Sequence, residues 1–95
     1  MDADKVINMC RERARAHSLS ADKYVNWFGN PNPKYGWHLD LRHAYEKLAI
    51  NAIDNPSDSL HKMALMDGCV MQSLAMDIPL EHCSDIALLE LRKFN

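Results

Sequence analysis

Helix-breaking residues are scarce in this chain, and they fall between stretches of helical periodicity. Three glycines and four prolines occur among 95 residues, whereas Ala, Leu, Met, Lys, Arg and Glu, which favour helices, are plentiful. The strongest loop signal is Asn30-Pro31-Asn32-Pro33, and Pro56 and Pro79 mark two further breaks. No alternating run is long enough to predict a strand. The sequence therefore predicts an all-α fold.

The breaks divide the chain into about five helices. Apolar residues recur at helical spacing over 3–17, so a first helix is expected to end at Ser18-Leu19-Ser20. Ser20 is a suitable N-cap for a short second helix over 21–28. A third helix is predicted to begin at Pro33 or, because of Gly36, nearer Trp37, and to end near residue 54. Further helices are predicted over about 57–76 and 80–94. Because 95 residues make one small domain, we expect residues 1–95 to form a single compact bundle with short loops.

The charge of the chain is modest and unevenly distributed. Its net charge is −2, with eight Lys and Arg against six Asp and Glu in residues 1–48, and three against seven in residues 49–95. A protein that coats nucleic acid is expected to be strongly basic. No apolar run approaches the roughly 18 residues of a membrane span, and the first residues do not resemble a signal peptide. We therefore expect a cytoplasmic protein with no membrane partner.

Cysteine and histidine spacings do not predict a metal or catalytic site. Cys10, Cys69 and Cys83 are an odd number with no CxxC pair, which is typical of free thiols. Two metal ligands on one helix need to be three or four residues apart, whereas His38 and His43 are separated by five. Without a loop signature for a nucleophile either, we expect a non-enzymatic protein with no cofactor.

Two groups of side chains are candidates for binding a partner. Arg11 and Arg15 belong to a basic stretch that suits an acidic protein. The aromatic and basic residues beside the proline loop have the composition of an interface hot spot, although the aromatic ones would equally suit a small core. They are Trp27, Lys34, Tyr35 and Trp37. The sequence thus predicts a protein-interaction module, an adaptor or inhibitor that docks on a larger protein complex or on a second copy, by analogy with small inhibitors from mobile elements.

Residues 19–38 suggest an alternative function. A capping Ser20, apolar residues and then Gly29 resemble the second helix and turn of the lambda-repressor-like helix-turn-helix. This resemblance implies that the following helix reads the major groove through its first side chains, Lys34, Tyr35 and His38. A helix-turn-helix DNA-binding regulator is therefore the alternative.

The predicted helix over 57–76 contains two unusual residues. Asp67 falls within its most apolar arc, so a buried carboxylate would need a partner such as Arg42, Lys62 or a histidine, unless it is exposed. Gly68 is expected at a close contact between helices, where a larger residue would destabilise the fold. The methionines of this helix suit either a core or an adaptable interface.

The start of the same helix has a second resemblance. Asp58-Ser59-Leu60, followed about twenty residues later by Ile78-Pro79, resembles the phosphopantetheine-attachment region of acyl carrier proteins. The same residues also fit a simple helix cap.

Overall fold

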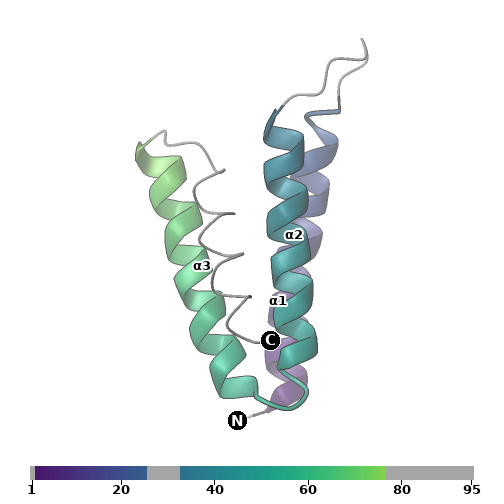
Figure 1. Ribbon diagram of the computed structural model, residues 1–95, viewed down its shortest axis with the longest axis vertical. Coiled ribbons are helices and arrows are strands. Elements are labelled where there is room, and N and C mark those ends of the chain that lie inside the picture. The colour runs from purple at the N-terminus through teal and green to yellow at the C-terminus, as the bar shows by residue number, and fades with distance from the viewer. Residues whose placement is uncertain (1, 26–32, 77–95) are drawn as a thin grey trace.

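Three helices form the part of the chain that the structure, a computed structural model, describes, which is residues 2–25 and 33–76. They are α1 (Ala3–Asp22), α2 (Pro33–Asn51) and α3 (Pro56–Met76). Figure 1 shows α1 and α2 side by side and antiparallel, with α3 running back along them. No strand occurs within the described ranges. The predicted all-α class is therefore confirmed for this part of the chain.

The first helix is longer than its sequence suggests. The Asp2 side chain caps it by accepting a hydrogen bond from the Asp4 backbone at 3.0 Å. The predicted break at Ser18-Leu19-Ser20 is wrong, because α1 continues through it to Asp22. Ala21 is fully buried and extends the buried stripe of α1, so packing outweighs the weak preference of serine for helix ends.

The count of five helices is not matched for this reason. Residues 21 and 22 belong to α1, and residues 23–25 form a turn rather than the first part of a short second helix. Residues 26–28 of that prediction and the predicted helix over 80–94 lie outside the described residues. The predicted helices over 33–54 and 57–76 correspond to α2 and α3.

The turn between α2 and α3 is fixed by side chains from both helices. Pro56 occupies the first position of α3, where its missing N–H costs nothing. The Asn51 amide donates to Ser59 Oγ at 2.8 Å and to Asp58 Oδ2 at 3.1 Å. Ser59 is fully buried and donates in turn to the Leu48 carbonyl at 2.8 Å. These bonds hold the start of α3 against the end of α2.

Small side chains form much of the interface between α1 and α2. The buried core residues are Val6, Cys10, Ala14 and Ala21 from α1, Leu41, Ala44, Tyr45, Leu48 and Ala49 from α2, Ala52 from the following turn, and Met63 and Met66 from α3. Alanine at the contact lets two helix axes approach closely. Met63 and Met66 are thus core residues, whereas Met71 is 70% exposed.

Gly68 differs from its expected role. It is exposed, and a Cβ built on it would meet no atom of the described residues within 4 Å. The expectation of a close helix contact is wrong, because α3 faces the core through Met63 and Met66 on another side of the helix.

Candidate functional site

A groove of about 500 Å³ lies between α1 and α2. Each helix contributes one stripe of side chains at helical spacing, and the last residue of the second stripe is in the turn after α2. The lining residues are Ile7, Arg11, Ala14, Arg15 and Ser18 from the first stripe, and Arg42, Glu46, Ala49, Ile50 and Ile53 from the second. Ala14 and Ala49 are buried and form the floor. The groove therefore has a floor of small side chains and long side chains on both sides.

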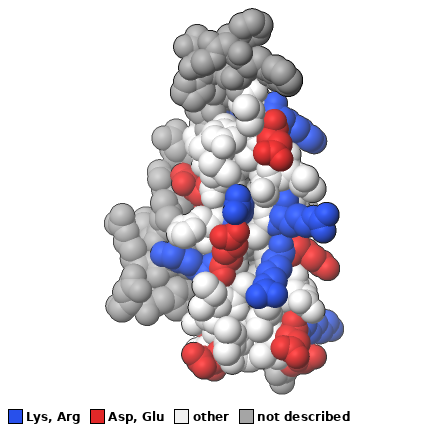
Figure 2. Space-filling model, turned by 90° about the vertical axis from the view of Figure 1, so that its right-hand side faces the viewer, with Lys and Arg blue, Asp and Glu red and all other residues white. Residues whose placement is uncertain are grey.

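The two ends of the groove differ in chemistry. Because α1 and α2 are antiparallel, Ile7 lies at the same end as Ile50 and Ile53. Ile50 and Ile53 are 68% and 64% exposed. Figure 2, which views the molecule from the side opposite α3, shows several Lys and Arg side chains at mid-height, interspersed with Asp and Glu, and a largely uncharged surface below them with acidic side chains at its edges. One end of the groove is apolar and the other is basic.

The arginines of the groove are available to a ligand. Arg42 Nε lies 2.9 Å from Glu46 Oε1, but both side chains are 44% exposed and one helical turn apart. Such surface pairs contribute only about 0.3–0.5 kcal/mol. Within residues 2–25 and 33–76, Arg11 and Arg15 have no ion-pair partner, and both are exposed.

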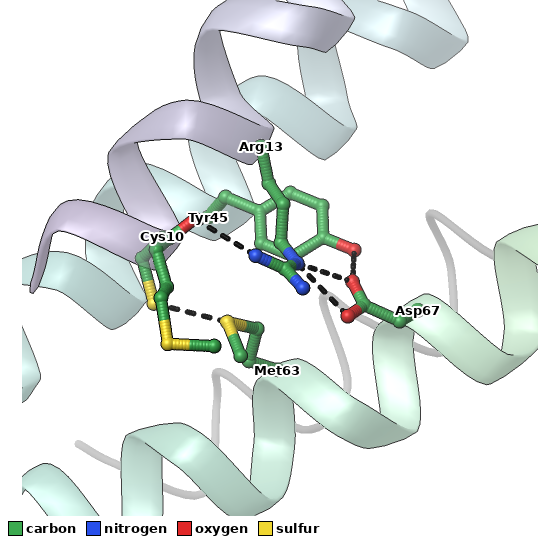
Figure 3. Close-up of polar contacts among 6 residues, drawn as sticks. Cys10, Arg13, Tyr45, Met63 and Asp67 are labelled. Carbon is green, nitrogen blue, oxygen red and sulfur yellow. Dashed lines mark hydrogen bonds and ion pairs between the residues drawn. The ribbon is translucent and has the colours of Figure 1, made fainter. Parts of the chain in front are cut away.

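A second polar cluster joins α1 and α2 to α3 and does not belong to the groove. Arg13 Nε donates to both carboxylate oxygens of Asp67, at 2.8 and 2.9 Å, and the Tyr45 hydroxyl donates to the same carboxylate at 2.6 Å (Figure 3). Burial, and then the hydrogen bond to Asp67, raise the pKa of Tyr45, so its phenol remains a donor. The cluster turns Arg13 toward α3 and away from Arg11 and Arg15.

The partner of Asp67 is therefore not among the candidates expected from the sequence. Arg42 pairs with Glu46, and Lys62 pairs with Asp58 at 3.4 Å. The Asp67 side chain is 29% exposed. Arg13 was missed because it lies on another helix, 54 positions away in the sequence.

His17 of α1 and His38 of α2 lie in contact with each other, toward the end of the α1–α2 pair that is away from Ile7 and Ile53. His17 Nδ1 lies 3.0 Å from His38 Nδ1, so one ring donates and the other accepts. The His17 ring stacks on Tyr45, and the His38 ring stacks on Tyr24. Burial, and then the neighbouring His38, lower the pKa of His17 to about 4. Burial, and then Lys34 and Lys23, lower the pKa of His38. Both rings are thus neutral near pH 7.

The predicted partner-binding residues fall in two separate places. Arg11 and Arg15 line the groove. Lys34, Tyr35 and Trp37 do not line it. Lys34 is exposed, with its Nζ 5.5 Å from the centre of the Tyr24 ring. Trp37 is partly buried and packs against the core, and Trp27 lies outside the described residues.

Of the residues that line the groove, sequence reasoning identified only Arg11 and Arg15 as candidates for binding, and it missed Arg42, Ile50 and Ile53 among others. The two isoleucines lie outside the buried stripe of α2, which contains Leu41, Tyr45 and Leu48. Large apolar residues away from the core stripe were the available signal.

The burial of Ser59 bears on the resemblance to acyl carrier proteins. A serine that carries a prosthetic group needs an accessible hydroxyl. Ser59 has no exposed surface, and its Oγ is hydrogen-bonded to the Leu48 carbonyl and the Asn51 amide. The structure therefore favours the alternative in which this serine holds the start of α3.

Comparison with known proteins gives no relative from which to transfer a function. No protein-family model, curated protein or solved structure matches the chain. None of the three described helices has both the length and the apolar character needed to cross a membrane. In the described part of the chain, no three His, Cys, Asp or Glu side chains are grouped so as to hold a metal ion. The function must therefore be inferred from the geometry of the surface.

Proposed function

We propose that this protein is a small helical protein-interaction module that docks on a partner protein through the α1–α2 groove. The observation that carries the proposal is the pair Ile50 and Ile53, about two-thirds exposed, at the end of a groove that also presents arginines. Exposed apolar side chains bordered by polar ones mark interaction surfaces. Arginine is also enriched among residues that contribute most to binding.

The proposed role is that of a cytoplasmic adaptor or inhibitor. Cys10 is a buried free thiol, which suits a reducing compartment. The module would act by occupying a surface of a larger protein complex. Such a role needs a stable scaffold and one accessible face.

DNA binding as a helix-turn-helix regulator is the less supported proposal. The resemblance requires a short helix beginning at Ala21, whereas Ala21 ends the buried stripe of α1 and residues 23–25 form a turn. A DNA-binding face also needs many phosphate contacts. The groove contributes three arginines, one of them already paired with Glu46.

A selection experiment tests the docking proposal. A yeast-displayed library of helical peptides, about six turns long and randomised on one side, is selected against the immobilised full chain. We expect the recovered peptides to lose affinity at least about 30-fold when Ile50 and Ile53 are both changed to Ser, which is the effect of removing an interface hot spot.

The matched control changes Leu65 and Met71 to Ser, because these exposed apolar residues of α3 lie outside the groove. Circular dichroism checks that both double variants remain helical. Peptides that tolerate the change at Ile50 and Ile53, or that depend on Leu65 and Met71 instead, would overturn docking through this groove.

A further inference from the structure

The geometry points to an acidic amphipathic helix of another protein as the occupant of the groove; this inference rests on the docking function proposed above. The surface offers a shape, a charge pattern and an internal competitor for the charge. The shape, the charge pattern and the competing side chain each restrict the kind of partner that can bind.

The shape of the groove suits a helix. Two antiparallel helices that each present one stripe of side chains leave a channel in which a third helix can lie at about 8–10 Å from each axis, as in a helical bundle. Ala14 and Ala49 at the floor add no bulk that would keep such a helix away. On the other side of the α1–α2 pair, α3 contributes Met63 and Met66 to the core that it shares with these two helices.

The arginines of the groove favour a partner that carries carboxylates. Arg11 and Arg15 are one helical turn apart on α1, and Arg42 extends from α2 into the same groove. Guanidinium groups bind carboxylates through paired hydrogen bonds. Acidic residues one turn apart on a partner helix have Cβ atoms about 5–6 Å apart, which matches the spacing of Arg11 and Arg15. The partner should therefore carry a row of Asp or Glu at this end.

The apolar end of the groove favours an amphipathic helix over a nucleic acid as the ligand. Ile7, Ile50 and Ile53 would lie against the phosphate backbone, where they gain nothing. The same residues can bury the leucines or phenylalanines of an amphipathic helix. A helix that is apolar at one end of its docking face and acidic at the other satisfies both halves of the groove.

Glu46 acts as a competitor within the groove. Its carboxylate occupies Arg42 at 2.9 Å in the free protein, at the place where a partner's carboxylate would bind. Its negative charge also repels an acidic helix. Replacing Glu46 with Gln should therefore strengthen the binding of an acidic helix. A substitution that merely damaged the fold would weaken binding instead.

The test uses the peptides selected above. We expect acidic residues, one turn apart and next to an apolar stripe, to be enriched among those that depend on Ile50 and Ile53. For the strongest peptide, changing Arg11 and Arg15 to Glu should weaken binding by about tenfold or more, and Glu46→Gln should tighten it by about two- to threefold. A peptide with Gln in place of its acidic residues should bind more weakly and lose the response to Glu46→Gln.

The control for charge changes Lys5 and Lys47 to Glu, which are exposed residues outside the groove and give the same change in net charge. Peptides that depend on Ile50 and Ile53 but lack acidic residues would overturn the inference while leaving the docking function intact. If no recovered peptide depends on Ile50 and Ile53, the proposed docking function is itself overturned. Tighter binding of a 20-base-pair DNA duplex than of any peptide, lost on changing Arg11 and Arg15, would assign the basic end to nucleic acid and overturn both.

Discussion

Asp67 places a charge where the sequence of α3 is mostly apolar, and its neighbours explain how the charge is tolerated. Arg13 bridges both of its oxygens, and the hydroxyl of the buried Tyr45 gives it a third hydrogen bond. No buried side-chain nitrogen or oxygen among the described residues lacks a hydrogen-bond partner. The three residues therefore form one unit that connects all three helices.

We expect Asp67→Ala to lower the free energy of unfolding by about 1–3 kcal/mol, because the Tyr45 hydroxyl would remain buried without an acceptor and Arg13 would lose its pair. Urea unfolding followed by circular dichroism measures this change. Glu46→Gln is the matched control, since its exposed pair with Arg42 should account for no more than about 0.5 kcal/mol. Equal effects of the two substitutions would contradict a special role for the cluster.

The histidine pair makes stability depend on pH. The folded-state pKa of His17 is about 4, below its usual value of 6.5, so the unfolded chain binds a proton between these values that the folded chain does not. This contribution is fully present above pH 6.5 and is lost as the pH falls toward 4. Its upper limit is about 3 kcal/mol, and partial exposure of the ring reduces it.

Urea unfolding at about pH 7 and pH 5 tests this dependence. His17→Gln should lose less stability than the wild type over that interval, while His43→Gln, at an exposed histidine of α2, should behave like the wild type. If His17→Gln and the wild type have the same pH dependence, His17 does not remain neutral in the folded protein.

At the scale of one helix, α3 contains a glycine, Gly68, that makes no close contact within the described part of the chain. Ala is more favourable than Gly in an exposed helix by about 0.5–1 kcal/mol, and no described residue would contact a Cβ at Gly68. We expect Gly68→Ala to raise the melting temperature and Ala64→Gly, at an exposed position of the same helix, to lower it. A lower melting temperature for Gly68→Ala would show that Gly68 packs closely against another part of the protein.

The elements show which features could be predicted from sequence. The existence of α2 and α3 follows from the breaks around them, and Pro33 is suited to the first helical position where α2 begins. α3 begins at Pro56 itself, one residue before the predicted helix over 57–76. The end of α1 could not be predicted, because Ser18 and Ser20 are weak local signals and the burial of Ala21 depends on the helix opposite.

The candidate site was harder to predict than the helices. Arg11 and Arg15 were identified from their charge alone. Ile50 and Ile53 acquire a role only when two helix faces adjoin, and periodicity within one helix cannot show which faces those are. The pairs of Arg13 with Asp67 and of His17 with His38 were missed for the same reason.

At the scale of the whole molecule, three helices bury a core of small side chains on the α1–α2 side and methionines on the α3 side. The Cys10 thiol lies where these parts meet, with its sulfur 3.8 Å from the Met63 sulfur (Figure 3). It has no exposed surface, and burial raises its pKa.

Cys10 can therefore serve as a chemical reporter of how often the folded molecule opens. In a variant with Cys69 and Cys83 changed to Ser, iodoacetamide should modify Cys10 at least about a thousandfold more slowly in buffer than in urea, because reaction requires the helices to separate. The ratio of the two rates gives the free energy of opening, read by mass spectrometry. A ligand that spans α1 and α2 must slow this reaction further, so the buried thiol would register binding in the groove without contacting the ligand.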